Sequence, residues 1–463
     1  MTELAVHIVE TLSLGDRSYV LTDGSVALVV DPQRDVDRVL DLTERLGVRI
    51  AAVAETHGHN DYVSGGLELA TRTGARYVVP HDMGAAFPHT PVSDGDTFSV
   101  GDLRVTVLHT PGHTHHHVAY AVAVLDAPVE AVLTGGSMLF GSTGRTDLVG
   151  PEHTRGLTSA QFHSVRRLAA ELPADADVLP THGFGSFCSA TPTSGDASTI
   201  AEQRDTNPAL TQDEQTYVET LLAGLDAFPA YYVHMGPLNR RGPAPVDLSE
   251  PEHVDPAELL ARIDAGEWVV DLRARTAFAA GHLAGTRSVE LGTSFVTYLG
   301  WLMPWGAPLT LIGASREQVA EARRELVRIG VDDLAGAAVG DLATLAAGRP
   351  LRSYRVSDFA GLAVRQAAEA DGPVHVLDTR RNDERAAGHV AGSQHIPVHQ
   401  LESRLGEVPL GEVWVYCGSG YRAAIAASLL DVPGRTLVHV DEGYEAAAAA
   451  GLESPAVHDV DDS

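Results

Sequence analysis

Short runs of aliphatic and β-branched residues alternate with helical stretches through the first 180 residues of the chain. Six of these runs have the length and composition of buried β-strands: residues 18–21, 27–30, 51–54, 76–79, 105–108 and 129–133. Three intervening segments have the character of helices: residues 36–46, 67–73 and 159–172. This alternation of strands and helices predicts an α/β domain.

A proline-rich segment, residues 237–256, has the composition of a linker and ends this domain near residue 245. Beyond it the chain contains an internal repeat, because Asp271 and His282 recur at the same offset as Asp378 and His389, in matching sequence contexts. Each copy continues into another strand and helix, so both copies are predicted to be α/β units. We therefore expect three domains: residues 1–245, 246–350 and 351–463.

Composition restricts the classes of partner. The chain has 463 residues, with 62 Asp and Glu against 33 Lys and Arg, and a formal net charge of −29. This charge argues against binding of nucleic acid or of an anionic membrane surface. We expect no membrane segment and no secretory signal, because neither an 18-residue apolar stretch nor a basic and then apolar N-terminus occurs. With only Cys188 and Cys417, the composition favours a reducing, cytoplasmic location.

The sequence around Cys417 has the pattern of a reactive-thiol loop. Cys417 follows a predicted strand, and Arg422 begins a predicted helix. The loop between them consists of Gly418, Ser419, Gly420 and Tyr421. Its glycines allow backbone N–H groups to turn inward as an anion nest, while the helix N-terminus and the arginine favour a thiolate. We therefore predict that Cys417 is a nucleophile rather than an inert buried cysteine.

Together with the aspartate after a strand and the Gly-His-x-x-Gly segment, this loop resembles the rhodanese family. The resemblance implies transfer of sulfane sulfur through a persulfide on Cys417. The six-residue loop matches the sulfurtransferases, whereas the related phosphatases have a longer one. The first copy departs from this pattern, because Gly313 and Gln318 occupy the positions of the cysteine and the arginine. We expect that copy to be a structural or docking domain without catalytic activity.

Histidines are concentrated in the first domain, where 13 of the 22 lie within the first 182 residues. His57, His59 and Asp61 lie on one loop after a predicted strand, and His113 and His182 each follow another strand. Loops that meet at strand ends can hold a metal ion through imidazole and carboxylate groups. We predict a metal site formed by these five residues.

These segments resemble the metallo-β-lactamase superfamily, and their fusion to rhodanese repeats resembles its persulfide dioxygenase and sulfurtransferase branch. The resemblance implies a metallo-β-lactamase αββα sandwich followed by two rhodanese-like α/β domains. It implies two groups of ligands: His57, His59 and His113 at one metal position, and Asp61 and His182 at the other. Two positions depart from the family, because Tyr62 replaces a histidine and Gly136 replaces the aspartate that bridges both metals.

These departures leave three alternatives for the metal. His59 completes a three-histidine site, Asp61 supplies the carboxylate, or the domain has lost its metal. We expect one metal ion at most, with iron favoured over zinc, because the resemblance to persulfide dioxygenases implies a single iron. The histidines at residues 115–117 lie at the start of a predicted strand, so at most one or two of them are expected to point inward.

The resulting prediction is an enzyme of sulfane-sulfur metabolism whose partners are a low-molecular-weight thiol persulfide or thiosulfate. A persulfide dioxygenase-like metal domain would yield sulfite, and Cys417 would supply or remove sulfane sulfur. Two alternatives stay open: a metal-dependent thioester hydrolase similar to hydroxyacylglutathione hydrolase, and a non-catalytic scaffold that serves the rhodanese domain. Cys188 is either a relay thiol or unreactive. Association into a homo-oligomer is expected on general grounds.

Overall fold

The computed structural model describes residues 3–191, 193, 195–368 and 374–454. The chain forms two compact units, of which the first comprises residues 1–247 and 324–332 and the second residues 248–323 and 333–463. Every helix in the described ranges is too short or too polar to cross a lipid bilayer.

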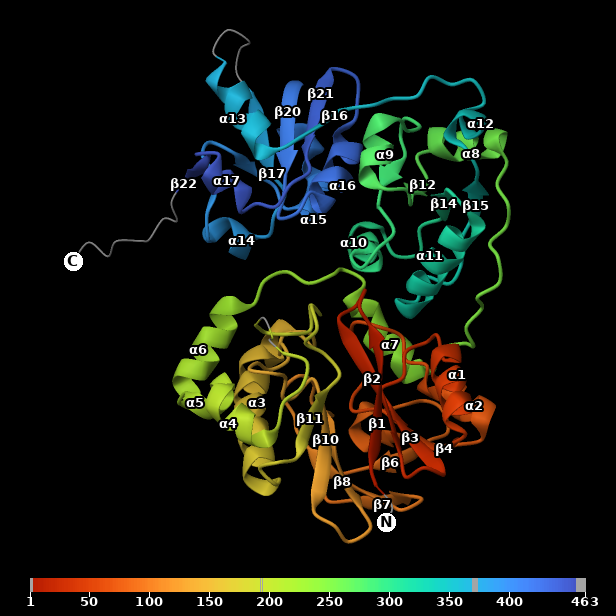
Figure 1. The fold of residues 1–463 in the computed structure, drawn as a ribbon, viewed down its shortest axis with the longest axis vertical. Coiled ribbons are helices and arrows are strands. Elements are labelled where there is room, and N and C mark those ends of the chain that lie inside the picture. The colour runs from red at the N-terminus through yellow and green to blue at the C-terminus, as the bar shows by residue number, and fades with distance from the viewer. Residues whose placement is uncertain (1–2, 192, 194, 369–373, 455–463) are drawn as a thin grey trace, which may run out of the picture. The chain divides into compact units, whose positions relative to one another are not determined.

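Two β-sheets form the centre of the first unit (Figure 1). The six strands of the first sheet are β1 (Ala5–Thr11), β2 (Asp16–Thr22), β3 (Val26–Val30), β4 (Arg49–Ala54), β5 (Arg76–Pro80) and β6 (Thr90–Val92). The five strands of the second sheet are β7 (Thr97–Val100), β8 (Leu103–His109), β9 (Val118–Val124), β10 (Val129–Gly135) and β11 (Asp177–Pro180). Strands β3 and β4 pair in parallel, so the loops that follow them leave the same edge of the first sheet.

Helices cover the outer face of each sheet. The first sheet carries α1 (Asp37–Leu46) and α2 (Gly66–Thr73). The second carries α3 (Pro151–Glu171), α4 (Ile200–Thr206), α5 (Pro208–Thr211) and α6 (Glu214–Gly224). Between the sheets, fully buried side chains such as Leu28, Val30, Val107 and Tyr120 form a continuous core. This layering confirms the predicted αββα sandwich.

All six predicted strands are present, but the predicted start of one helix and the predicted extent of the linker need correction. Helix α3 begins at Pro151 and not at residue 159, because proline is well suited to the first helical position. Helix α7 (Tyr232–Arg241) extends into the predicted linker and contains Pro237 in its interior. An interior proline removes a backbone hydrogen bond, but Tyr232, Met235 and Asn239 are buried and anchor the helix. Residues 237–241 are therefore helical.

The second unit contains two parallel sheets. The first has β13 (Arg287–Ser288), β12 (Trp268–Asp271), β14 (Leu309–Gly313) and β15 (Gly336–Val339) in spatial order. The second has β16 (Arg355–Ser357), β21 (Arg435–Val440), β20 (Gly411–Tyr416), β17 (His375–Asp378) and β19 (Gln394–His395). A separate antiparallel pair is formed by β18 (His389–Val390) and β22 (Glu453–Ser454). The helices are α8 (Pro256–Asp264), α9 (Arg275–Ala280), α10 (Phe295–Leu302), α11 (Arg316–Arg328), α12 (Leu342–Ala346), α13 (Phe359–Ala367), α14 (Asn382–Ala386), α15 (Val398–Leu401), α16 (Tyr421–Leu430) and α17 (Ala446–Ala449).

The two copies of the repeat have the same local geometry after their first long strand. Asp271 ends β12 and accepts hydrogen bonds from the backbone and guanidinium of Arg273. Asp378 ends β17 and accepts the equivalent bonds from Arg380. The repeat in the sequence is thus also a repeat in local structure, while the division of this unit into domains at residue 350 stays a prediction.

Candidate functional site

The loop that carries His57, His59 and Asp61 begins where β4 ends, and all three side chains are buried. Asp31, just after β3, fixes the start of this loop. One of its carboxylate oxygens accepts from the Thr56 N–H and the other from the Thr56 hydroxyl, both at 2.7 Å. Because that hydroxyl donates to Asp31, its oxygen accepts from Nδ1 of His57 at 2.9 Å. The lone pair of His57 is therefore on Nε2, as in metal-binding histidines oriented by a carboxylate.

His113 reaches the cluster from the loop after β8. Its Nδ1 donates to the backbone carbonyl of Arg145 at 2.7 Å, which leaves the lone pair on Nε2. That Nε2 is buried and has no hydrogen-bond partner among the described residues. Burial lowers the pKa of His113 to about 3, so the ring is neutral at physiological pH. Neutral imidazole is the form that binds metals.

His182, after β11, faces His57 across the cluster. Its Nδ1 lies 2.9 Å from Asp16 and 3.1 Å from Asp61. Burial alone would lower the pKa of His182, but the charges of these two carboxylates outweigh it and raise the pKa. The Nε2 atoms of His182 and His57 are 3.3 Å apart. Two nitrogen ligands at about 2.0–2.1 Å from one tetrahedral cation are about 3.3–3.4 Å apart, so the spacing suits a shared cation as well as a shared proton.

His59 turns its Nε2 away from His57 and toward carboxylates. This atom lies 3.2 Å from both Asp31 and Glu55, and 3.0 Å from the hydroxyl of Tyr62. Burial would lower the pKa of His59, but the two carboxylates outweigh it and raise the pKa to about 9. Its Nδ1 is buried and has no hydrogen-bond partner in the described part of the chain. Nδ1 is therefore unsatisfied, while Asp31, Glu55 and His59 form a further group whose ligand atoms lie within 4.8 Å of one another.

Two carboxylates complete the cluster. Asp16, which the sequence analysis missed because it lies at the start of a strand outside any motif, contacts His182. Burial and then the charge of Asp61 raise the pKa of Asp16 to about 8. One oxygen of Asp16 and one of Asp61 are buried with no hydrogen-bond partner among the described residues. Such buried acceptors are unfavourable unless a proton or a cation satisfies them.

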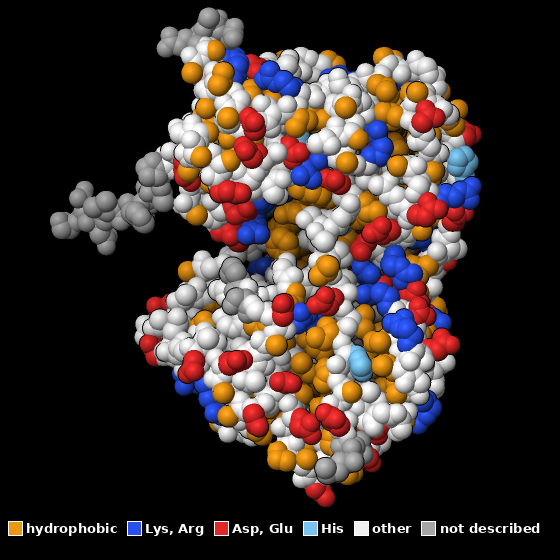
Figure 2. Space-filling view, viewed as in Figure 1, with side chains coloured by type: hydrophobic (Ala, Val, Ile, Leu, Met, Phe, Trp, Pro, Cys, Tyr) orange, Lys and Arg blue, Asp and Glu red, His pale blue; other side chains and the backbone are white. Residues whose placement is uncertain are grey.

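Ligand atoms of these residues lie close enough together to hold a metal ion. Those of His57, His59 and His182 lie within 4.8 Å of one another, as do those of Asp16, Asp61 and His182. These three histidines are buried, and Figure 2 shows few histidine side chains on the visible face of the molecule, where acidic side chains and arginines carry the charge. The chemistry and burial of the donors therefore fit a metal ion, and four of the five predicted ligands, all except His113, fall within these two groups.

The two departures from the family pattern have structural explanations. Tyr62 is fully buried and stacks on His59, with ring centroids 4.3 Å apart. At Gly136, a Cβ atom would lie 2.4 Å from Cδ2 of His113. The ring of His113 therefore occupies the space that a side chain at position 136 would need.

The histidines at residues 115–117 precede a strand instead of beginning it, because β9 starts at Val118. Nε2 of His116 accepts from the Gly58 N–H, and Nε2 of His117 accepts from the Gly136 N–H, both at 2.9 Å. The predicted start of the strand is thus wrong, but the expectation that at most two of these side chains point inward holds, since His115 is exposed and the other two rings support the loops of the cluster.

Helix α7 holds the histidine loop from outside. The Asn239 amide donates to the carbonyl oxygens of His59 and Tyr62, both at 2.9 Å, and accepts from the Ser64 N–H at 2.8 Å. A segment predicted to be linker therefore positions the metal loop.

Cys188 also belongs to this cluster. It is fully buried, and its sulfur lies within 4.8 Å of ligand nitrogens of His113 and His182. The sequence pointed to Cys188 only as a relay or unreactive thiol and not as a neighbour of the histidines, because it lies in an irregular loop with no ligand spacing to nearby residues.

In the second unit, Cys417 lies between the end of β20 and the start of α16, as predicted, and is buried. Gly420 has a φ of +86°, and a Cβ there would lie 2.1 Å from Asp441. Arg422 pairs through both terminal nitrogens with Glu384, at 2.5 and 2.6 Å. The guanidinium is therefore fixed in place, since a two-pronged ion pair restrains its rotation.

The first copy of the repeat contributes to the surroundings of this loop. Tyr298 of α10 lies beside Tyr421 of this loop. Its ring centroid is 5.9 Å from that of Tyr421, whose hydroxyl donates to the Glu290 carbonyl at 2.8 Å. These contacts bring the first copy beside the Cys417 loop, while its structural or docking role stays a prediction.

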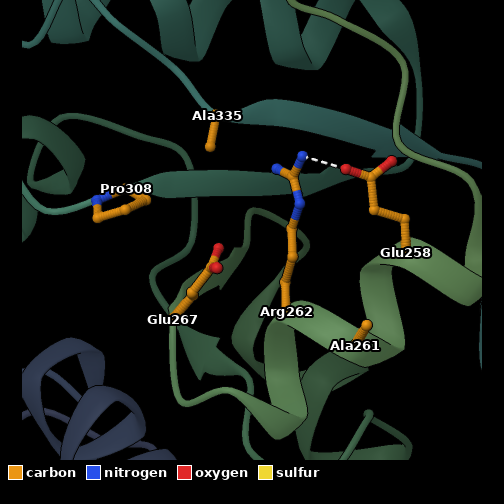
Figure 3. A pocket seen from close by; sticks show the side chains of 6 residues that line it. All are labelled: Glu258, Ala261, Arg262, Glu267, Pro308 and Ala335. Atoms are coloured by element: carbon orange, nitrogen blue, oxygen red, sulfur yellow. Dashed lines mark hydrogen bonds and ion pairs between the residues drawn. The ribbon is translucent and has the colours of Figure 1, made fainter.

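In the first copy, the loop that corresponds to the Cys417 loop is held by hydrogen bonds of the Gln318 side chain. The Gln318 amide accepts from the Ala314 N–H at 2.8 Å and donates to the Leu272 carbonyl at 2.9 Å. A shallow pocket elsewhere on this copy contains no predicted site residue and is lined by Glu258, Ala261, Arg262, Glu267, Pro308 and Ala335 (Figure 3). Neither feature presents a nucleophile.

Comparison with known proteins defines the class of the chain. Residues 16–182 match the metallo-beta-lactamase superfamily, and residues 363–450 match the rhodanese-like domain. The chain belongs to the metallo-β-lactamase superfamily and carries a rhodanese-like domain after it, which confirms these two parts of the prediction, while the rhodanese-like character of the first copy stays a prediction. Cys417 and Arg422 lie inside the second matched segment, whereas Cys188 lies outside the first.

Individual relatives narrow this class. The mitochondrial persulfide dioxygenase ETHE1 of Homo sapiens is 28% identical over 246 residues, which cover 53% of this chain and 82% of that protein. A hydroxyacylglutathione hydrolase of Maricaulis maris is 30% identical over 190 residues, covering 40% and 68%. The crystal structure of a metallo-beta-lactamase from Staphylococcus aureus matches with a TM-score of 0.65 and 25% identity, covering 73% of this chain and 99% of that one.

Proposed function

We propose that the chain is an enzyme of sulfane-sulfur metabolism that combines a persulfide dioxygenase-like metal domain with sulfur transfer at Cys417. The observation that carries the proposal is the presence, on one chain, of a buried histidine and carboxylate cluster and of a cysteine loop between a strand and a helix. Similarity to a persulfide dioxygenase in the first unit and to rhodanese-like domains in the second supports it.

Sulfur transfer starts with attack of the Cys417 thiolate on the outer sulfur of thiosulfate. A bond forms between Sγ and that sulfur while the S–S bond of thiosulfate breaks, and sulfite leaves with the electron pair. The terminal sulfur of the resulting persulfide then passes to an acceptor thiolate, and Cys417 returns to its thiolate form. Backbone N–H groups of the loop and Arg422, restrained by Glu384, stabilise the negative charge in both steps.

His57, His113 and His182 are the residues proposed to hold the metal, completed by His59 or Asp61. Imidazole and carboxylate donors suit iron and zinc, and similarity to the persulfide dioxygenase favours iron. When bound, iron would supply the redox chemistry by which molecular oxygen and water convert the terminal sulfur of a thiol persulfide to sulfite and release the thiol.

The surrounding residues orient these ligands and keep bulk water out. Asp31 acts through Thr56 to fix the proton of His57 on Nδ1. Asp16 does the same for His182. Because sulfite is the product of the first chemistry and a partner in the second, reversal of the Cys417 reaction would combine it with a persulfide to form thiosulfate. That shared compound is the proposed reason for the fusion.

Thioester hydrolysis is the second candidate, favoured by similarity to hydroxyacylglutathione hydrolases. It requires a metal-activated water, normally at two metals in this superfamily. Tyr62 and Gly136 each remove a ligand of the second metal position. A non-catalytic first unit is the third candidate.

The proposal is tested on the full chain purified without chelator. We expect iron near one equivalent and oxygen uptake with glutathione persulfide, in the wild type and in Cys417→Ser alike. Transfer of sulfur from thiosulfate to cyanide should fall to background in Cys417→Ser, whereas His113→Ala should lose iron and keep this transfer. Zinc with thioester hydrolysis would replace the proposal by the second candidate. Absence of metal and of oxygen uptake would support the third.

A further inference from the structure

We propose that Cys188 is a ligand of the metal ion, taking the place of the carboxylate that Gly136 lacks. This inference rests on the metal site of the proposed function. It assigns the role of a ligand to a cysteine that lies outside the matched superfamily segment.

The position of Cys188 suits a ligand. Its sulfur and the ligand nitrogens of His113 and His182 lie within 4.8 Å of one another, and all three side chains are fully buried. When a metal ion displaces the protons of His182 and of the thiol, two imidazoles and a thiolate form a donor set that zinc, iron and cobalt accept. Nε2 of His113 is buried and has no hydrogen-bond partner in the described ranges, so its lone pair is available to a metal ion.

The backbone holds the cysteine and His113 in one rigid assembly. Arg145 donates its N–H to the Cys188 carbonyl at 2.8 Å, and its own carbonyl accepts from Nδ1 of His113 at 2.7 Å. The Arg145 guanidinium donates to the Phe187 carbonyl at 3.1 Å. On the other side, the Ser186 hydroxyl accepts from the Cys188 N–H at 3.1 Å. Arg145 thus positions both Cys188 and His113, as a preorganised site requires.

The surroundings of the thiol differ from those of an inert buried cysteine. Buried structural cysteines usually pack among apolar side chains, whereas this one hydrogen-bonds to the Asp61 carboxylate and has ligand nitrogens of two imidazoles within 4.8 Å. The fold also explains why the cysteine comes from a different loop. Position 136 has no room for a side chain beside His113, so an anionic ligand must approach the imidazoles from elsewhere, and the loop after β11 provides one.

The test is titration of the metal-free full chain with cobalt(II), because a thiolate ligand gives an intense near-ultraviolet charge-transfer band that imidazole and carboxylate do not. We expect the band in the wild type and in the matched control Cys417→Ser, which retains Cys188 as its sole thiol. Cys188→Ser should still bind cobalt, without the band and with at least about tenfold weaker affinity.

X-ray absorption at the metal edge of zinc-loaded Cys417→Ser gives a second test that leaves Cys188 in place. A sulfur neighbour at about 2.3 Å is expected. Cobalt or zinc bound without the band or the sulfur neighbour would overturn the inference and leave the metal site standing. Failure of the wild type to bind either metal would overturn both.

Discussion

Restoring the aspartate of the family at position 136 is expected to damage the metal centre. A Cβ at Gly136 would lie 2.4 Å from Cδ2, 2.7 Å from Cγ and 3.0 Å from Nε2 of His113. His113 has little room to retreat, because its Nδ1 is bonded to the Arg145 carbonyl and the backbone of Gly144 lies close to its ring. Any side chain at position 136 must therefore displace a proposed ligand.

The size of the effect follows from overpacking. An extra carbon in a closely packed interior costs about 1–3 kcal/mol. In a unit of this size, each kcal/mol lowers Tm by about 2–4 °C, so Gly136→Ala should lower the Tm of the first unit by about 2–12 °C. Gly136→Asp has the same clash and adds a carboxylate, so it should lose at least as much stability.

The assay is calorimetric unfolding together with metal content and cobalt affinity. Gly156→Ala is the matched control, since a Cβ there meets no atom within 4 Å and the site is helical. It should leave Tm unchanged or raise it slightly, because alanine favours a helix over glycine by about 1 kcal/mol. We expect both Gly136 variants to bind metal more weakly than the wild type.

The reasoning would be refuted by a Gly136→Asp protein that is as stable as the wild type and binds metal more tightly. That result would mean that His113 moves aside freely and that the family carboxylate is simply absent. An unchanged Gly136→Ala protein would refute the steric argument alone.

Two further predictions concern the second unit. Burial would raise the pKa of Asp378, but the bonds and charge of Arg380 outweigh it and lower the pKa, so its stabilisation is present at neutral pH and is lost as the pH falls through this lowered value. Asp378→Asn should lose about 3–5 kcal/mol of the free energy of unfolding at pH 7. In urea unfolding, the free energy of this variant should fall less steeply with decreasing pH than that of the wild type, and an equal slope would contradict the argument. Gly420→Ala should lower sulfur transfer at least about tenfold, through strain at positive φ and the clash with Asp441. Gly406→Ala is the control, because a Cβ there has no atom within 4 Å, and it should retain the wild-type rate of sulfur transfer. Equal rates in the two variants would contradict the argument from strain and clash at Gly420.

Local pattern determined much of the architecture. The alternation of buried strands and helices, the repeat and the strand-to-helix context of Cys417 depend on residues near one another in the chain, and the structure contains them as predicted. The histidine loop could be found for the same reason, since His57, His59 and Asp61 follow one strand. Helix α7 was misread because a proline signals a break, whereas burial of its inner face outweighs that signal.

Tertiary structure decided which chemical groups meet. Asp16 and Cys188 carry no local signature. An antiparallel bridge between the start of β2 and the end of β11 brings Asp16 to His182, and the path of the loop after β11 brings Cys188 to His182 and His113. The partner of Arg422 likewise comes from a distant helix, at Glu384. Sequence spacing specifies which way neighbouring side chains point. Contacts between loops that are distant in the sequence depend on how the two sheets pack, and no short-range pattern encodes the distance between such loops.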